Sequence, residues 1–142
     1  MTNFGLLLVA AIFGIQTAVQ PAPPTASKQC SQAGIQQLRI YEIFENNKVA
    51  FHARFRDHAL RIMDRHGFNV VQVWETRHGG RTEFSYLLEW PDEATTKKQW
   101  AAFMADEEWS RVKRDTGAVH GRFVGAIEER VLRKTDYSPC MG

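Results

Sequence analysis

Apolar residues alternate with polar residues, at the spacing of a strand, in four separate segments of the chain. The segments are rich in Val, Ile, Phe, Tyr and Trp, which strands favour, and they cover residues 36–44, 68–76, 83–90 and 122–133. Between the second and third segments, residues 78–81 read His-Gly-Gly-Arg, and two glycines permit the positive φ of a tight turn. We therefore expect four strands, with the middle two joined by a hairpin.

Residues 48–65 repeat apolar side chains at the spacing of a helix. The apolar stripe consists of Phe51, Phe55, Ala59, Ile62 and Met63. Asn46-Asn47 supplies a cap before this helix. His66-Gly67 ends it, because glycine readily takes the left-handed conformation of a helix stop.

A second helix is predicted from its cap at Asp92 to about Arg114, and one face of it carries Trp100, Phe103 and Met104. A loop over residues 117–121 then leads to the last strand. The complete order is strand, helix, strand, strand, helix, strand. This order is typical of the ferredoxin-like α+β fold, in which both helices pack on one face of a four-stranded antiparallel sheet.

The predicted strands are apolar on both faces. The opposing sets are Leu38 and Ile40 against Tyr41 and Ile43, Val71 and Val73 against Val70 and Trp74, and Phe84, Tyr86 and Leu88 against Leu87. Two helices cover only one face of a sheet, and a large bare apolar face is rare on a monomer. We therefore expect a homodimer in which two sheets form one α/β-barrel. The pattern does not decide which face of each strand meets the helices.

The 142 residues are 44% hydrophobic and 24% charged, which is ordinary for a globular protein. We expect one domain over residues 36–134 and a short C-terminal tail over residues 135–142. The net charge of +2, without a basic stripe interleaved with aromatic residues, argues against a nucleic-acid partner.

Residues 1–27 contain no charged side chain and include an apolar run of 12 residues over positions 4–15. Such a run is too short to span a bilayer, which takes about 20 residues, and it matches the core of a signal peptide. Pro21-Ala22-Pro23-Pro24 then forms an extended linker. We predict export, to a periplasm or to the exterior. Two alternatives stay open, because no Lys or Arg precedes the run. One is an uncleaved anchor, which is the only case that would imply a membrane partner. The other is a misplaced start of a cytosolic domain.

The two cysteines flank the predicted domain. Cys30 precedes the first strand by six residues, and Cys140 follows the last strand by seven. These strands are antiparallel neighbours in a ferredoxin-like sheet, so the two sulfurs can reach each other. Export would favour a disulfide between them. The alternative is a pair of free or intermolecular thiols.

Four motifs together resemble the NIPSNAP family. They are Leu38-Arg39-Ile40-Tyr41, Phe55-Arg56-Asp57-His58 with His66-Gly67, Val73-Trp74-Glu75, and the block from Trp100 to Trp109. The resemblance covers roughly residues 36–134 and implies the dimeric α/β-barrel form of the ferredoxin-like fold. The chain departs from the family pattern at Glu107, where relatives tend to carry Pro. This departure concerns only the local helix break that such a proline would imply.

The resemblance implies a ligand site more readily than a reaction. Related dimeric α/β-barrel families hold small hydrophobic ligands between the helices and the sheet of each subunit. Some of these relatives are monooxygenases or cyclases that work without a metal, and some degrade haem. NIPSNAP relatives are linked more to interaction roles than to a settled reaction.

Five residues are candidates for such a site. His58 falls on the apolar stripe of the first helix, where a neutral imidazole donates one hydrogen bond and accepts another. Arg39, Tyr41 and Trp74 lie on the first two strands, and the arginine could hold a carboxylate or enolate by two hydrogen bonds. Tyr86 is the fifth. Plainer interpretations stay open, with His58 and Tyr86 as core residues and Arg39 in a solvated ion pair.

No motif predicts a metal or a cofactor. The five histidines show no i, i+4 pair and no neighbouring cysteine, and no glycine-rich phosphate loop follows a strand. Two functions remain. The favoured one is a homodimer that binds a small hydrophobic or aromatic ligand or a protein partner. The alternative is a cofactor-independent monooxygenase- or cyclase-like enzyme with His58 as base and Arg39 holding negative charge.

Overall fold

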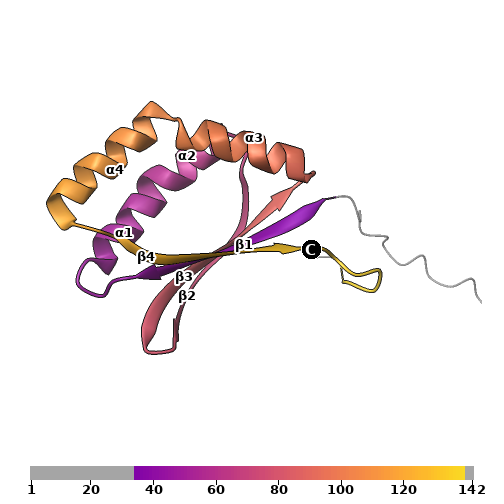
Figure 1. The fold of residues 1–142 in the computed structure, drawn as a ribbon, viewed down its shortest axis with the longest axis horizontal. Helices are drawn as coiled ribbons and strands as arrows, with labels where there is room; N and C mark the ends of the chain where they lie inside the picture. The colour runs from indigo at the N-terminus through magenta and orange to yellow at the C-terminus, as the bar shows by residue number, and fades with distance from the viewer. Residues whose placement is uncertain (1–33, 140–142) are drawn as a thin grey trace, which may run out of the picture.

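The four predicted strands form one antiparallel sheet in the computed structural model, which describes residues 34–139. The strands are β1 (Ile35–Ile43), β2 (Asn69–His78), β3 (Arg81–Trp90) and β4 (Val124–Leu132). Their order across the sheet is β2-β3-β1-β4 (Figure 1). Because this is the strand order of a ferredoxin-like sheet, the predicted fold class is confirmed.

The helices within residues 34–139 all lie on one side of this sheet, as Figure 1 shows. The first helical segment comprises α1 (Lys48–Arg54), η1 (Phe55–Ala59) and α2 (Leu60–Arg65), and the second comprises α3 (Glu93–Met104) and α4 (Glu107–His120). The core that they bury against the sheet includes Phe51, Ile62, Phe84, Tyr86, Leu88 and Phe103. We call the covered side of the sheet the helix face and the other side the open face.

The prediction of one regular first helix is wrong in its middle, where η1 is a π-helical turn. The Leu60 N–H donates there to the Phe55 carbonyl, five residues back. Buried residues of this segment that are spaced four apart are Phe51, Phe55, Ala59 and Met63. In an α-helix of 3.6 residues per turn, each step of four rotates such a stripe by about 40°. The wider π turn reduces this rotation, so the stripe stays on the sheet.

The predicted extent of the second helix is wrong in two ways. The helix is interrupted before Asp106, between α3 and α4. In addition, α4 continues over residues 117–120, where a loop was expected. Asp106 has an extended backbone, and its carboxylate accepts a hydrogen bond from the Trp109 N–H at 2.9 Å, which caps α4. The same carboxylate lies 2.7 Å from His66 Nε2 and 2.7 Å from the Arg65 guanidinium. At this break, Asp106 therefore both caps α4 and contacts the first helical segment.

Strand pairing decides which side chains face the helices. Arg39 of β1 pairs with Tyr86 of β3, and Tyr86 pairs in turn with Val73 of β2, so all three share the helix face. Trp74, one residue further, therefore lies on the open face and is 47% exposed. The interpretation that put Val70 and Trp74 on one face is wrong, because a bulge after Val70 inserts an extra residue between them.

The open face carries an apolar patch. By register, its apolar side chains include Leu38, Ile40, Trp74, Leu87 and Leu132. No helix within residues 34–139 covers this face (Figure 1). The expected homodimer would bury it, and this association stays a prediction.

Two predictions fall on residues outside the described range. They are the signal peptide with its linker over residues 1–27, and the disulfide between Cys30 and Cys140. Within residues 34–139, no helix is both long enough and apolar enough to cross a membrane.

A candidate ligand pocket between the sheet and the helices

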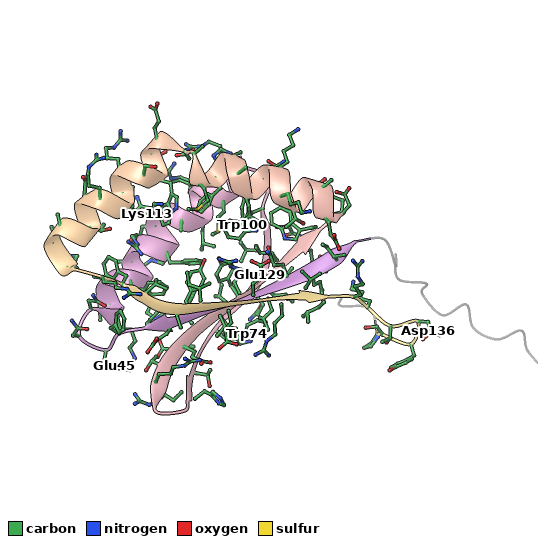
Figure 2. All side chains as sticks on the ribbon, viewed as in Figure 1. Glu45, Trp74, Trp100, Lys113, Glu129 and Asp136 are labelled. Carbon is green, nitrogen blue, oxygen red and sulfur yellow. The ribbon has the colours of Figure 1, made fainter. Side chains whose placement is uncertain are left out.

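A pocket of about 270 Å³ lies between the helix face of the sheet and the helices. Its walls come from β1, β4 and both helical segments. The lining side chains are Arg39, Tyr41, Phe51, Arg54, Phe55, Ala59, Met63, Trp100, Phe103, Met104, Trp109, Lys113, Val124 and Ile127. Labels on Trp100, Lys113 and Glu129 in Figure 2 locate α3, α4 and β4 around this space. Aromatic and aliphatic side chains predominate, and three cations interrupt them.

The two tryptophans of the pocket are held in place by their neighbours. Trp100 donates its indole N–H to Gln37 Oε1 at 2.8 Å, and the same oxygen accepts from Trp90 at 3.0 Å. Gln37 is only 2% exposed, so this acceptor has little access to water. Trp109 stacks on Phe103 with ring centroids 5.2 Å apart. Both aromatic walls are therefore formed before any ligand arrives, which lowers the entropic cost of binding.

Arg39 and Tyr41 line the sheet side of the pocket. The Arg39 guanidinium lies 4.7 Å from the centre of the Trp100 ring and pairs with Glu129 of β4. Burial acts against its charge, but the neighbouring Tyr41, Tyr86 and Glu129 raise the pKa of Arg39 above its usual value. This cation is already neutralised by an acid of the protein.

The Tyr41 and Tyr86 hydroxyl groups are 2.6 Å apart. Burial is the main cause that raises the pKa of Tyr86 well above its usual value, and Tyr41 adds to it. Tyr86 therefore stays a neutral phenol behind the pocket wall. The pair fixes the orientation of Tyr41, which is the member that reaches the cavity.

Arg54 of α1 and Lys113 of α4 are the other two cations. The Arg54 guanidinium lies 4.2 Å from the centre of the Phe123 ring, and Lys113 Nζ lies 5.7 Å from that of Trp109. Burial lowers the pKa of Arg54, because removing a cation from water disfavours its charge. Neither cation forms an ion pair with an acid within residues 34–139.

His58 does not line the pocket. It is half-buried in η1, whose π turn presents Phe55 and Ala59 to the cavity instead. The expectation that His58 shares the sheet-facing stripe assumed a regular helix, in which a residue three positions after Phe55 lies nearly above it. An enzyme that uses His58 as a base within this pocket has no support from this geometry.

The other predicted site residues are divided by the fold. Arg39 and Tyr41 line the pocket, and Tyr86 lies directly behind Tyr41. Trp74 is on the opposite side of the sheet, so the pocket does not gather all five candidates. The roles of these residues in ligand binding stay predictions.

The sequence interpretation missed Arg54, Lys113 and Trp109 as pocket residues. A signal for each is visible in the spacing. Arg54 lies within the apolar stripe, between Phe51 and Phe55, where a solvated cation is out of place. Lys113 follows Trp109 by four residues, so the two share one face of α4.

The lining of this pocket is mostly apolar, with cations at a few positions. Flat aromatic walls suit an apolar or aromatic group, and cations near Trp109 suit a negative charge. Glu129 pairs with Arg39, which is one of the lining side chains. Within residues 34–139, no cluster of three or more His, Cys, Asp or Glu side chains is arranged to hold a metal ion.

Several solved structures share this fold. A NIPSNAP-like domain protein from Burkholderia xenovorans is 18% identical with a TM-score of 0.65, and the match covers 78% of this chain and 93% of that one. A NIPSNAP family protein of unknown function from Agrobacterium tumefaciens is 16% identical with a TM-score of 0.65, over 78% and 96% of the two chains. A further NIPSNAP family protein from that organism is 18% identical with a TM-score of 0.65, over 76% and 99%.

The family assignment depends on a separate comparison. No curated protein matches the chain. The structural likenesses are all below 20% identity, so they describe the fold alone. The NIPSNAP family model, however, matches residues 36–139, which is most of the chain and all of the described strands and helices except the first residue of β1. The chain therefore belongs to the NIPSNAP family.

Proposed function

We propose that this protein binds a small hydrophobic or aromatic molecule in the pocket between the helices and the sheet. The observation that carries the proposal is the aromatic wall, in which Trp100 is held by Gln37 and Trp109 by Phe103. An apolar cavity whose walls are already rigid loses little conformational entropy when it is filled. A flat ring that packs against either indole would also gain aromatic contacts.

Thermal-shift measurements with neutral quinones, flavonoids and long-chain alcohols test the proposal. A compound present at about 100 times its Kd stabilises the folded state by about 2.7 kcal/mol. Met104 lies on the rim, since it lines the pocket and is still 54% exposed. We expect Met104→Trp to narrow the opening and abolish the shift.

Val119→Trp is the matched control for this variant. Val119 is 75% exposed on α4 and does not line the pocket. An equally large indole at that position should leave the ligand-induced shift unchanged. Loss of the shift in both variants, or in neither, would contradict binding at this site.

We also propose that two copies associate through the open face. The support is its apolar patch, in which Trp74 is 47% exposed. Light scattering after size exclusion should give a dimer for the wild-type protein and a monomer for Trp74→Glu. Val119→Glu, which adds the same charge on the other side of the molecule, should remain dimeric. A wild-type monomer at micromolar concentration would refute the association.

Export and a Cys30–Cys140 disulfide complete the proposal. Both derive from the sequence, since residues 1–27 are uncharged and the cysteines flank neighbouring strands. Intact mass after alkylation in denaturant, with and without prior reduction, is the test. Two alkylated thiols in unreduced, natively produced protein would contradict the disulfide.

A further inference from the structure

We propose that the ligand of this pocket carries a carboxylate, held by Arg54 and Lys113 beside the Trp109 indole. The inference depends on the proposed function, because it specifies the chemistry of the molecule that the same pocket binds. It names the class as aryl or alkyl carboxylates rather than neutral hydrophobic molecules.

The first support is the charge balance of the pocket. Arg39 is paired with Glu129, so an acid of the protein already counters its charge, although its Nε–H has no hydrogen-bond partner within residues 34–139. Arg54 and Lys113 form no ion pair within residues 34–139. The rest of the chain contains no Asp or Glu side chain that could serve them. Within residues 34–139, the cavity therefore presents two positive charges that no acid side chain pairs.

Neighbouring acids are already engaged elsewhere. Asp115 of α4 lies 3.4 Å from its neighbour Arg114. Glu108, at the start of the same helix, pairs with Arg61 and Arg65 of the first helical segment. Neither carboxylate pairs with the pocket cations, so the positive charge there is not compensated from α4.

The second support is the position of the two cations. The Arg54 guanidinium and Lys113 Nζ lie 5.6 Å and 5.7 Å from the centre of the same Trp109 ring. Both cations thus lie near one indole, and they come from two different helices. Among the described residues, Arg54 has one hydrogen bond, at 3.4 Å to the Thr116 hydroxyl, which leaves most of its five N–H donors unengaged there. A carboxylate beside the indole could accept from both side chains.

The third support is the cost of the unpaired state. A partly buried cation without an acid partner loses hydration that the aromatic rings of Trp109 and Phe123 and the Thr116 hydroxyl replace only in part. A bound carboxylate would restore that balance through charge-assisted hydrogen bonds, which are the stronger kind. The apolar part of the ligand would then lie along Phe55, Met63 and Trp100, which line the rest of the cavity.

Isothermal titration with 2-naphthoate and with 2-naphthalenemethanol separates charge from shape. The two probes have the same ring and differ in the carboxylate. We expect the carboxylate to bind about ten-fold more tightly or better, as hydrogen bonds to charged groups imply. Lys113→Met, which keeps most of the aliphatic stem, should remove most of this preference, and Arg54→Gln should do the same.

Lys98→Met on α3 is the matched control, since Lys98 is exposed and does not line the pocket. It changes the net charge equally and should preserve the preference. Equal affinity for the two probes would overturn the inference while leaving the proposed function intact. Binding of neither probe would count against both. A loss in Lys98→Met as large as in Lys113→Met would assign the preference to overall charge and overturn the inference. If Arg54→Gln fails to fold, Lys113→Met decides alone.

Discussion

Asp106→Ala should destabilise the protein by about twice as much as the loss of an ordinary helix cap. Asp106 caps α4 through the Trp109 N–H, and its carboxylate also contacts His66 and Arg65. The side chain is 9% exposed. Loss of a cap costs about 1 kcal/mol. The contacts to His66 and Arg65 add about 1 kcal/mol together, because the Arg65 side chain is 46% exposed.

Asp92→Ala supplies the matched control. Asp92 caps α3 by accepting from the Thr95 N–H at 2.7 Å, but it has no contact to the first helical segment. We expect Tm to fall by about 5 °C in Asp92→Ala and by about 10 °C in Asp106→Ala, from about 5 °C per kcal/mol for a domain of this size. Asp106→Asn keeps a good capping side chain and loses the charge, so its Tm should fall by about 5 °C, which corresponds to the His66 and Arg65 contacts alone.

The pH dependence provides a second readout. A hydrogen bond from His66 is the main cause that lowers the pKa of Asp106, followed by the Trp109 N–H and Arg65. Because the folded pKa lies below the unfolded value of about 3.9, the stabilisation is complete above that value and is lost as pH falls through the folded pKa. The Tm difference between wild type and Asp106→Asn should therefore have its full value at pH 6 and shrink below pH 4.

Circular dichroism melts at pH 6 and pH 3 measure both quantities. Arg61 first, and then Arg65, lower the pKa of Glu108 to about 2. Wild type and variants all carry Glu108, so they share the stability that is lost when this carboxylate is protonated. Equal destabilisation by Asp106→Ala and Asp92→Ala would refute the reasoning. It would mean that contacts across the two helical segments contribute nothing and that the break depends on the cap alone.

Two further predictions concern the core and the start of β1. Gln37→Leu should cost about 2–4 kcal/mol in chemical denaturation, because it leaves two tryptophan N–H groups without an acceptor, whereas Gln36→Leu on the other face should cost far less. Gly34→Ala should cost about 1–3 kcal/mol, because φ is 118° and the new Cβ would lie 2.8 Å from the Trp90 carbonyl oxygen. Gly117→Ala, with open space in α4, should instead stabilise by about 0.4–1 kcal/mol, and two changes of the same sign would contradict this contrast.

Local patterns in the sequence are sufficient for the order and type of the elements. Alternation with a period of two marks the strands, glycines mark the hairpin, and Asp92 marks the start of α3 as predicted. These signals act over a few residues, within one element. They also place Arg39 and Tyr41 on one face of β1, which the structure turns toward the pocket.

Only the tertiary structure decided which residues meet. Trp74 and Arg39 lie on opposite faces of the sheet. Their placement depends on the bulge in β2 and on the pairing of both strands with β3, and neither feature is visible in the sequence of β2 alone. His58 leaves the pocket because the helix widens to keep Phe55 and Ala59 on the sheet. The sequence by itself determined the periodicity of each element, since periodicity is local, whereas the composition of the pocket depended on packing between elements that are distant along the chain.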